Sequence, residues 1–197
     1  MKKHNLFPTL ILEKENFLTK KQCNNIYKFI IDNKHLGKKH NAINNESVSS
    51  HSSVSNILKI IKEKVPECFN IENDILSISN DYFKETSYYG KNILDNSWFN
   101  IQTKDSILKE HTHPLCILSG VIFIKSDKQS SNICFENPNP FLKITSYKDS
   151  NNLYTSNKYC FPATTGSLLL FPSWLSHGSN NQLNKSQDRI AISFNIL

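Results

Sequence analysis

The spacing of apolar residues changes at Trp98, and this change limits the folds that the chain can adopt. Before Trp98, apolar residues recur at helical spacing. After it, short apolar or alternating runs are separated by Asn, Ser, Pro and Gly. Short strands at close spacing are typical of a sandwich or barrel, and helices that precede strands indicate an α+β domain. The predicted strands are Trp98–Gln102, Lys109–His113, Gly120–Lys125, Ser131–Phe135, Lys158–Phe161, Ser167–Phe171 and Arg189–Ile196. We therefore expect a double-sheet barrel with helices packed against its outside.

The first half of the chain predicts three amphipathic helices. Thr19 to Gln22 has the form of a capping box, in which side chains bond the free amides at a helix start. Apolar residues then follow at helical spacing, so a helix is expected from Lys20 to Asn33. The other expected elements are a helix at Ser53–Lys64 ended by Pro66, a helix at about Ile71–Tyr89 followed by Gly90, a strand at Phe7–Leu12, and loops at 35–52 and 136–157.

Composition favours one globular domain. The chain has 197 residues, of which 38% are hydrophobic and 20% charged, and this balance argues against disorder. We expect a single domain over residues 1–197, with 1–94 as mainly helical support and 95–197 as the β core. The net charge of +6 comes from scattered lysines rather than from a basic stripe with exposed aromatics, so no nucleic-acid partner is expected.

Two features bear on location. No apolar run approaches the ~18–20 residues that cross a bilayer, and the short apolar run near the start soon meets Glu13, Lys14 and Glu15, which makes a poor signal peptide. We therefore expect no membrane partner and a cytoplasmic location. The five cysteines are scattered, odd in number and without a CxxC pair, so they are expected to be reduced thiols.

Three histidines form a candidate metal site. His111 and His113 are two residues apart, so in an extended strand they would project from the same face. Imidazole is a good ligand for iron, zinc, copper and nickel. A third candidate ligand is His177, which follows the predicted strand Ser167–Phe171. The remaining histidines, His4, His35, His40 and His51, lie in polar segments and are expected to be exposed.

Arg189 is the only arginine in the chain. In the last predicted strand it shares one polar face with Ala191, Ser193 and Asn195, while the alternate residues form an apolar face. We expect the apolar face to pack against helices and the polar face to point into the barrel. A buried guanidinium needs a negative partner, and its planar fork suits a carboxylate, so a carboxylate ligand is expected there.

Three segments resemble a group of 2-oxoglutarate/Fe(II)-dependent oxygenases found in bacteria and their phages. They are HxHPxxxxSGVxF at His111–Phe123, PxxxGxLLLFPSWLxH at Pro162–His177 and RxxxSFN at Arg189–Asn195. The resemblance implies a double-stranded β-helix (a jelly-roll, cupin-like core), bound Fe(II) and 2-oxoglutarate as cosubstrate. It implies His111 and His177 as iron ligands, and Arg189, with help from Ser193, as the group that binds the far carboxylate of 2-oxoglutarate.

The position of His113 departs from this resemblance, because the wider superfamily has Asp or Glu there. Either His113 completes a three-histidine metal site, or water completes the coordination while His113 contacts substrate. A vacancy for an anion, as in a halogenase, is also open. Glu110 is close in sequence but would point to the opposite strand face.

The activity implied by the resemblance is hydroxylation of a C–H bond by O₂, with decarboxylation of 2-oxoglutarate to succinate. The substrate would be a small molecule or a peptide. Trp98, Asn100 and Gln102 share a strand face and are candidate pocket residues, although core packing is the favoured interpretation for Trp98 and for Trp174. The alternatives are a cupin-like three-histidine metalloprotein that does not use 2-oxoglutarate, and a jelly roll without metal.

Overall fold

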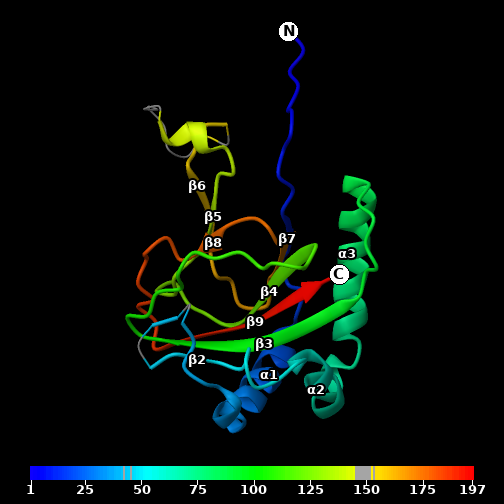
Figure 1. The fold of residues 1–197 in the computed structure, drawn as a ribbon. Helices are drawn as coiled ribbons and strands as arrows, with labels where there is room; N and C mark the ends of the chain where they lie inside the picture. The colour runs from blue at the N-terminus through cyan, green and yellow to red at the C-terminus, as the bar shows by residue number, and fades with distance from the viewer. Residues whose placement is uncertain (42, 45, 145–151, 153) are drawn as a thin grey trace.

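The computed structural model describes residues 1–41, 43, 44, 46–144, 152 and 154–197, and for 142 and 143 the backbone alone. Two antiparallel sheets pack face to face, and helices cover the outer face of the larger sheet (Figure 1). The helices are α1 (Lys20–Asp32), α2 (Ile57–Lys64) and α3 (Ile71–Thr86), with 3₁₀ turns at Lys34–Leu36, Pro66–Cys68 and Pro140–Lys143. This arrangement is the α+β jelly roll that the sequence predicts.

The larger sheet has the strand order β1-β7-β4-β9-β3-β2, and the smaller has the order β6-β5-β8. The strands are β1 (Leu12–Lys14), β2 (Val48–Ser49), β3 (Leu94–Thr103), β4 (Leu118–Lys125), β5 (Ile133–Glu136), β6 (Lys158–Phe161), β7 (Leu168–Pro172), β8 (His177–Gly178) and β9 (Asp188–Ile196). The two edge strands β1 and β2 come from the first half of the chain. That half therefore extends the sheet as well as supplying the helices.

Strand β9 lies inside the larger sheet and separates two cores. Ile190, Ile192 and Phe194 pack toward the helices, whereas Ala191 packs toward the smaller sheet. The expected alternation of this strand is thus confirmed. Its polar residues face the space between the sheets, where the candidate site lies.

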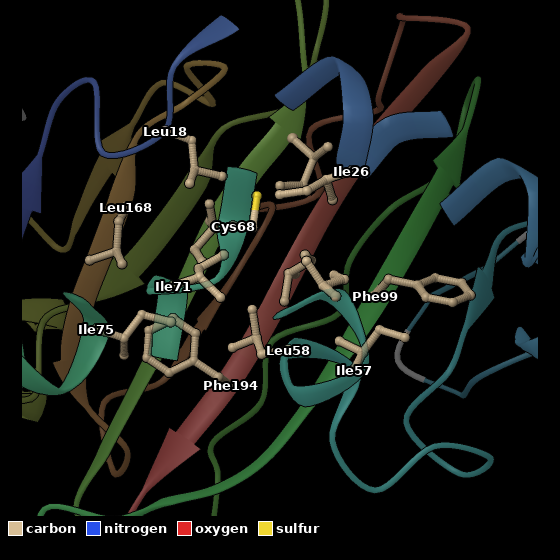
Figure 2. Close-up of a cluster of buried hydrophobic side chains, with 14 of the residues drawn as sticks. Leu18, Ile26, Ile57, Leu58, Cys68, Ile71, Ile75, Phe99, Leu168 and Phe194 are labelled. Atoms are coloured by element: carbon tan, nitrogen blue, oxygen red, sulfur yellow. The ribbon is translucent and has the colours of Figure 1, made fainter. Parts of the chain in front are cut away.

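The helix side of the larger sheet holds the main core (Figure 2). Ile26 from α1, Leu58 from α2 and Ile75 from α3 meet Phe99 and Phe194 from the sheet, and all five side chains are fully buried. Each buried side chain of this size contributes roughly 1.5–3 kcal/mol through apolar area removed from water. This core fixes β3 and β9, the two strands that carry Gln102 and Arg189.

Local capping decides where the helices begin and end. The capping box of α1 forms as predicted between Thr19 and Gln22. Helix α2 begins later than predicted because Asn56 caps it, with its side-chain oxygen accepting from the Lys59 amide at 3.0 Å. Helix α3 ends earlier than predicted, at Thr86. The left-handed residue that follows is Ser87 (φ 53°), so Gly90 does not cap the helix.

Two strand predictions were wrong. The segment Phe7–Leu12 is not a strand, because pairing with β7 starts only at Leu12. The segment Lys109–His113 forms a single bridge, between His111 and His177, rather than a strand. The amide of His113 donates to the carbonyl of Ser173 instead of to the segment that pairs with His111, so no continuous ladder forms.

The expectation of five reduced cysteines was also wrong. Cys134 on β5 and Cys160 on β6 are directly opposite, with Cα atoms 4.0 Å apart, and they form a disulfide. The two residues are 26 apart in sequence, so only the strand pairing brings them together. Cys23, Cys68 and Cys116 are free thiols.

Two further expectations concern exposure and loops. Trp174 is 54% exposed, so it is not a core residue, because it sits in the turn after β7 rather than in a strand. Of the predicted loop 136–157, residues 145–151 and 153 lie outside the described residues, and the described part contains the 3₁₀ turn at Pro140–Lys143.

None of the helices described has the length and apolar character needed to cross a bilayer.

Candidate metal centre

His111 and His177 are held together by backbone pairing. Each donates its amide N–H to the carbonyl of the other, both at 3.0 Å. His177 is also paired with Phe135 on β5, which ties it to the smaller sheet. Gly178 allows the close approach, because a Cβ there would lie 2.9 Å from the Leu108 carbonyl oxygen and 3.0 Å from the Glu110 backbone. Two imidazoles are thus placed side by side by main-chain geometry.

His113 reaches the same place from a different anchor. Its amide donates to the Ser173 carbonyl at 2.9 Å. The ring centroids of His113 lie 5.1 Å from those of both His111 and His177, and those two lie 4.5 Å apart. One ring nitrogen from each histidine falls within 4.8 Å of the other two, a spacing that a single metal ion can bridge.

The three imidazoles all form a hydrogen bond through Nδ1. Nδ1 of His111 lies 2.8 Å from the Lys109 carbonyl, and Nδ1 of His177 lies 2.9 Å from the Leu175 carbonyl. Nδ1 of His113 lies 2.8 Å from Oδ1 of Asn195. Carbonyl oxygens only accept, so each Nδ1 donates its proton and each Nε2 is left with a lone pair. Nε2 of His113 is buried and has no hydrogen-bond partner among the described residues, as a metal ligand would.

Burial keeps these imidazoles neutral. It lowers the pKa of His113 to about 4 and that of His177 to about 3, and the neighbouring imidazoles add to both shifts. Burial also lowers the pKa of His111. A neutral imidazole is the form that binds a metal, so the site is in its ligating form at neutral pH.

No acidic residue joins this group among the residues that the structure describes. Glu110, which is adjacent to His111, pairs instead with Lys158. Glu110 is thus not part of the metal-binding group, although the strand from which its orientation was predicted does not form. Three neutral nitrogen donors fit a divalent first-row metal such as iron or nickel.

Arg189 lies in the same cavity as the histidines and is 4% exposed. Its Nε donates to the Ser131 carbonyl at 2.9 Å, its Nη1 donates to Oε1 of Gln102, and its guanidinium lies 5.1 Å above the ring of Phe123. None of the ion pairs found among the described residues involves Arg189. Burial lowers its pKa to about 10, so it stays charged at neutral pH. A buried cation without a negative partner favours an anionic ligand.

The cavity measures about 520 Å³, which is within the usual range for a small-molecule site. Gln102 is 1% exposed, and its Nε2 has no hydrogen-bond partner among the described residues, so a donor is left for a ligand. Asn100 and Ser193 also line the cavity, where Nδ2 of Asn100 lies 3.1 Å from Oγ of Ser193. The structure thus gathers all seven sequence-predicted site residues into one cavity.

Several cavity residues lie outside the set of predicted site residues. Trp98 is buried as predicted, but it also lines the cavity, with its indole stacked on His113 at 5.5 Å. His40 and His51 also line the cavity, although both were assigned to a polar loop; His51 is exposed and His40 is half-buried. Neither belongs to the metal-binding group. The polar face shared with Arg189 was the only sequence signal for Asn195.

Comparison with known proteins decides the family. A family model described as "Putative 2OG-Fe(II) oxygenase", in which 2OG stands for 2-oxoglutarate, matches residues 96–195 of the 197. The chain belongs to this family. The protein is therefore an oxygenase that depends on Fe(II) and 2-oxoglutarate, as the sequence resemblance implies. A search of curated proteins found no significant match.

Solved structures share the oxygenase's fold at low sequence identity. HygX from Streptomyces hygroscopicus, with nickel and 2-oxoglutarate bound, is 13% identical, with a TM-score of 0.61 and coverage of 94% of this chain and 82% of HygX. A Pseudomonas putida prolyl-4-hydroxylase is 9% identical, with a TM-score of 0.58 and coverage of 95% and 92%. A viral collagen prolyl hydroxylase from Paramecium Bursaria Chlorella virus-1 is 8% identical, with a TM-score of 0.55 and coverage of 94% of both chains. These likenesses confirm the double-stranded β-helix.

Proposed function

We propose that this oxygenase hydroxylates a C–H bond, using His111, His113 and His177 to hold Fe(II) and Arg189 to bind 2-oxoglutarate. The balanced reaction takes the substrate, O₂ and 2-oxoglutarate to the hydroxylated product, succinate and CO₂. The observation that carries the proposal is one cavity that holds three imidazoles, with one ring nitrogen of each within 4.8 Å of the others, and a buried guanidinium that has no acidic partner among the described residues.

The three histidines support a three-coordinate protein site. Each Nδ1 has a fixed acceptor, so each ring is oriented and each Nε2 is available. Three protein ligands leave other positions on the metal open for a cosubstrate and O₂. Because His113 supplies a neutral nitrogen at the usual carboxylate position, the three ligands add no negative charge to the metal.

The cosubstrate end of the cavity is formed by Arg189 with Gln102 and Ser193. The guanidinium offers the planar donor pair that binds a carboxylate, and the unpartnered amide of Gln102 offers a further donor. The hydroxyl of Ser193 lines the same cavity. Together these groups would bind the far carboxylate of 2-oxoglutarate and so direct its oxo acid end toward the histidines.

The bound iron supplies the oxidising chemistry, while the protein positions the substrate carbon and excludes water. Trp98, Phe171 and Val121 form apolar parts of the cavity wall. Of the residues that line the cavity, His51 and Leu115 are exposed, so a small molecule or a peptide side chain would enter on their side.

Domain organisation and location complete the proposal. Helices and strands share one core across the larger sheet, which supports a single domain over residues 1–197. For location we propose the cytoplasm, because three of the five cysteines remain thiols. The Cys134–Cys160 disulfide is unusual for that compartment. The oxidation state of this pair in whole cells tests the assignment.

The test of function is anaerobic addition of Fe(II) and 2-oxoglutarate, which should produce a weak visible charge-transfer band. Arg189→Ala should abolish the band, and His35→Ala, at an exposed histidine that does not line the cavity, should leave it intact. With O₂ present, slow formation of succinate should follow. No band from the intact protein would refute the 2-oxoglutarate assignment. Metal binding that ignores Arg189 and 2-oxoglutarate would favour the cupin-like alternative.

A further inference from the structure

Asn195 lies in the middle of a polar row that crosses the larger sheet. It is directly opposite Ser119 on β4 and directly opposite Asn96 on β3, and it is 4% exposed. Its Oδ1 accepts from the Ser119 hydroxyl at 2.7 Å, and its Nδ2 donates to Oδ1 of Asn96 at 2.9 Å. The Ser119 hydroxyl lies 2.9 Å from that of Ser173, the residue whose carbonyl anchors His113.

The same Oδ1 of Asn195 lies 2.8 Å from Nδ1 of His113. His111 and His177 each use the backbone carbonyl two residues earlier as the acceptor for Nδ1. His113 is different, because its Nδ1 bonds a side chain, while the carbonyl two residues before it belongs to His111 and accepts the His177 amide at 3.0 Å. At His113 a side-chain amide thus takes the place that a backbone carbonyl has at the other two histidines.

The polar row favours one orientation of the Asn195 amide. If this amide were turned over while Asn96 kept its orientation, its NH₂ would face Nδ1 of His113, and its oxygen would face Oδ1 of Asn96, placing two acceptors together. His113 would then carry its proton on Nε2, the nitrogen that has no hydrogen-bond partner among the described residues. The hydrogen bond to Asn96 opposes this arrangement, and the bond from Ser119 supports the observed one.

We propose that Asn195 is a positioning residue that holds His113 in the Nδ1–H form, so that Nε2 is free to complete the metal site. The inference rests on the proposed function for its consequence, namely metal affinity. The tautomer of His113 in the metal-free protein is independent of that function. Groups that orient a metal-binding histidine typically change metal affinity 10- to 100-fold when they are removed.

The test compares Asn195→Leu, which removes the acceptor, with Asn195→Asp, which keeps one. In metal-free protein labelled with ¹⁵N-histidine, NMR should show His113 as the Nδ1–H form in the wild type and in Asn195→Asp. In Asn195→Leu it should shift toward the Nε2–H form. Titration with Ni(II) should show affinity about 10- to 100-fold lower for Asn195→Leu and near the wild-type value for Asn195→Asp.

A double-mutant comparison separates positioning from a general structural effect. In a His113→Ala background, Asn195→Leu should leave the remaining Ni(II) affinity unchanged, because the histidine through which it acts is gone. An equal loss in both backgrounds would overturn the proposal, and so would an unshifted His113 tautomer in Asn195→Leu.

If Asn195→Leu does not fold, Asn195→Ala carries the test. This smaller variant also removes the acceptor for Nδ1 of His113, and it should shift the tautomer in the same direction. An unchanged tautomer would then overturn the proposal. Wild-type protein with His113 in the Nδ1–H form but no Ni(II) binding would refute the proposed function and leave the role of Asn195 in orienting the ring supported.

Discussion

The guanidinium of Arg189 lies 5.1 Å above the ring of Phe123, and its Nε donates to the Ser131 carbonyl at 2.9 Å. These contacts fix the plane of the guanidinium, so the direction in which its remaining donors point is set before a ligand arrives. A lysine could preserve the charge at this position but neither the stacking nor the planar fork.

Arg189→Lys should therefore bind 2-oxoglutarate more weakly while keeping its metal. The loss of one charge-assisted hydrogen bond costs about 1.5–3 kcal/mol, which corresponds to a Kd roughly 10- to 100-fold higher. Titration of the Ni(II)-loaded protein with 2-oxoglutarate measures this change. Unaltered affinity for 2-oxoglutarate in Arg189→Lys would show that the far carboxylate binds elsewhere.

His113→Asp should restore the usual carboxylate at the third ligand position and retain metal binding. His113→Ala should lower Ni(II) affinity by at least about 10-fold, because one of three protein ligands is lost. Isothermal titration with Ni(II) and the visible spectrum of the Co(II) form distinguish the variants. If His113→Ala binds metal like the wild type, His113 is a substrate contact rather than a ligand.

Gly178→Ala should disturb the metal site through the backbone. The added Cβ would approach the Leu108 carbonyl oxygen to 2.9 Å and the Glu110 backbone to 3.0 Å, so the segment that carries His111 must move. We expect a loss of about 1–3 kcal/mol in the free energy of unfolding and weaker Ni(II) binding. Denaturant titration with and without Ni(II) measures both effects.

Gly90→Ala is the matched control for that variant. Its Cβ would meet only side-chain ends, with Ile117 at 2.8 Å and Phe83 at 3.0 Å, which can shift more easily than backbone. Even if Gly90→Ala is less stable than the wild type, Ni(II) should raise its free energy of unfolding by the same amount as in the wild type. If Gly178→Ala also keeps that stabilisation, the close packing at Gly178 is not what holds His111 against His177.

Reduction of the Cys134–Cys160 disulfide should lower stability by about 2–4 kcal/mol, since it closes a loop of 26 residues. Ni(II) affinity should fall as well, because β5 pairs on its other side with β8, which carries His177. Unfolding by denaturant, with and without reductant, gives the first value. Cys160→Ser should reproduce the reduced protein and should not respond to reductant, whereas equal stability in all three states would contradict a structural role for this bond.

The sequence located the elements whose signals are local. The Thr19 and Gln22 pair predicted the start of α1, and period-two alternation after Arg189 predicted both faces of β9. Predictions failed where a distant partner decides the outcome. The 109–113 segment has a strand-like pattern but only one bridging partner, and Asn56 rather than the periodicity of residues 53–56 sets the start of α2.

The sequence predicted which side chains could form the site, but it did not predict how these side chains are placed relative to one another. Two histidines at alternate positions and a lone arginine limited the ligands that the chain could bind, because imidazole and guanidinium have narrow chemical preferences. Three contacts depend on strand register across the two sheets. They are the approach of His177 to the other two histidines, the bond between Asn195 and His113, and the pairing of Cys134 with Cys160. Register is set by the packing of both cores at once, which brings together residues tens of positions apart, and only the tertiary structure contains that information.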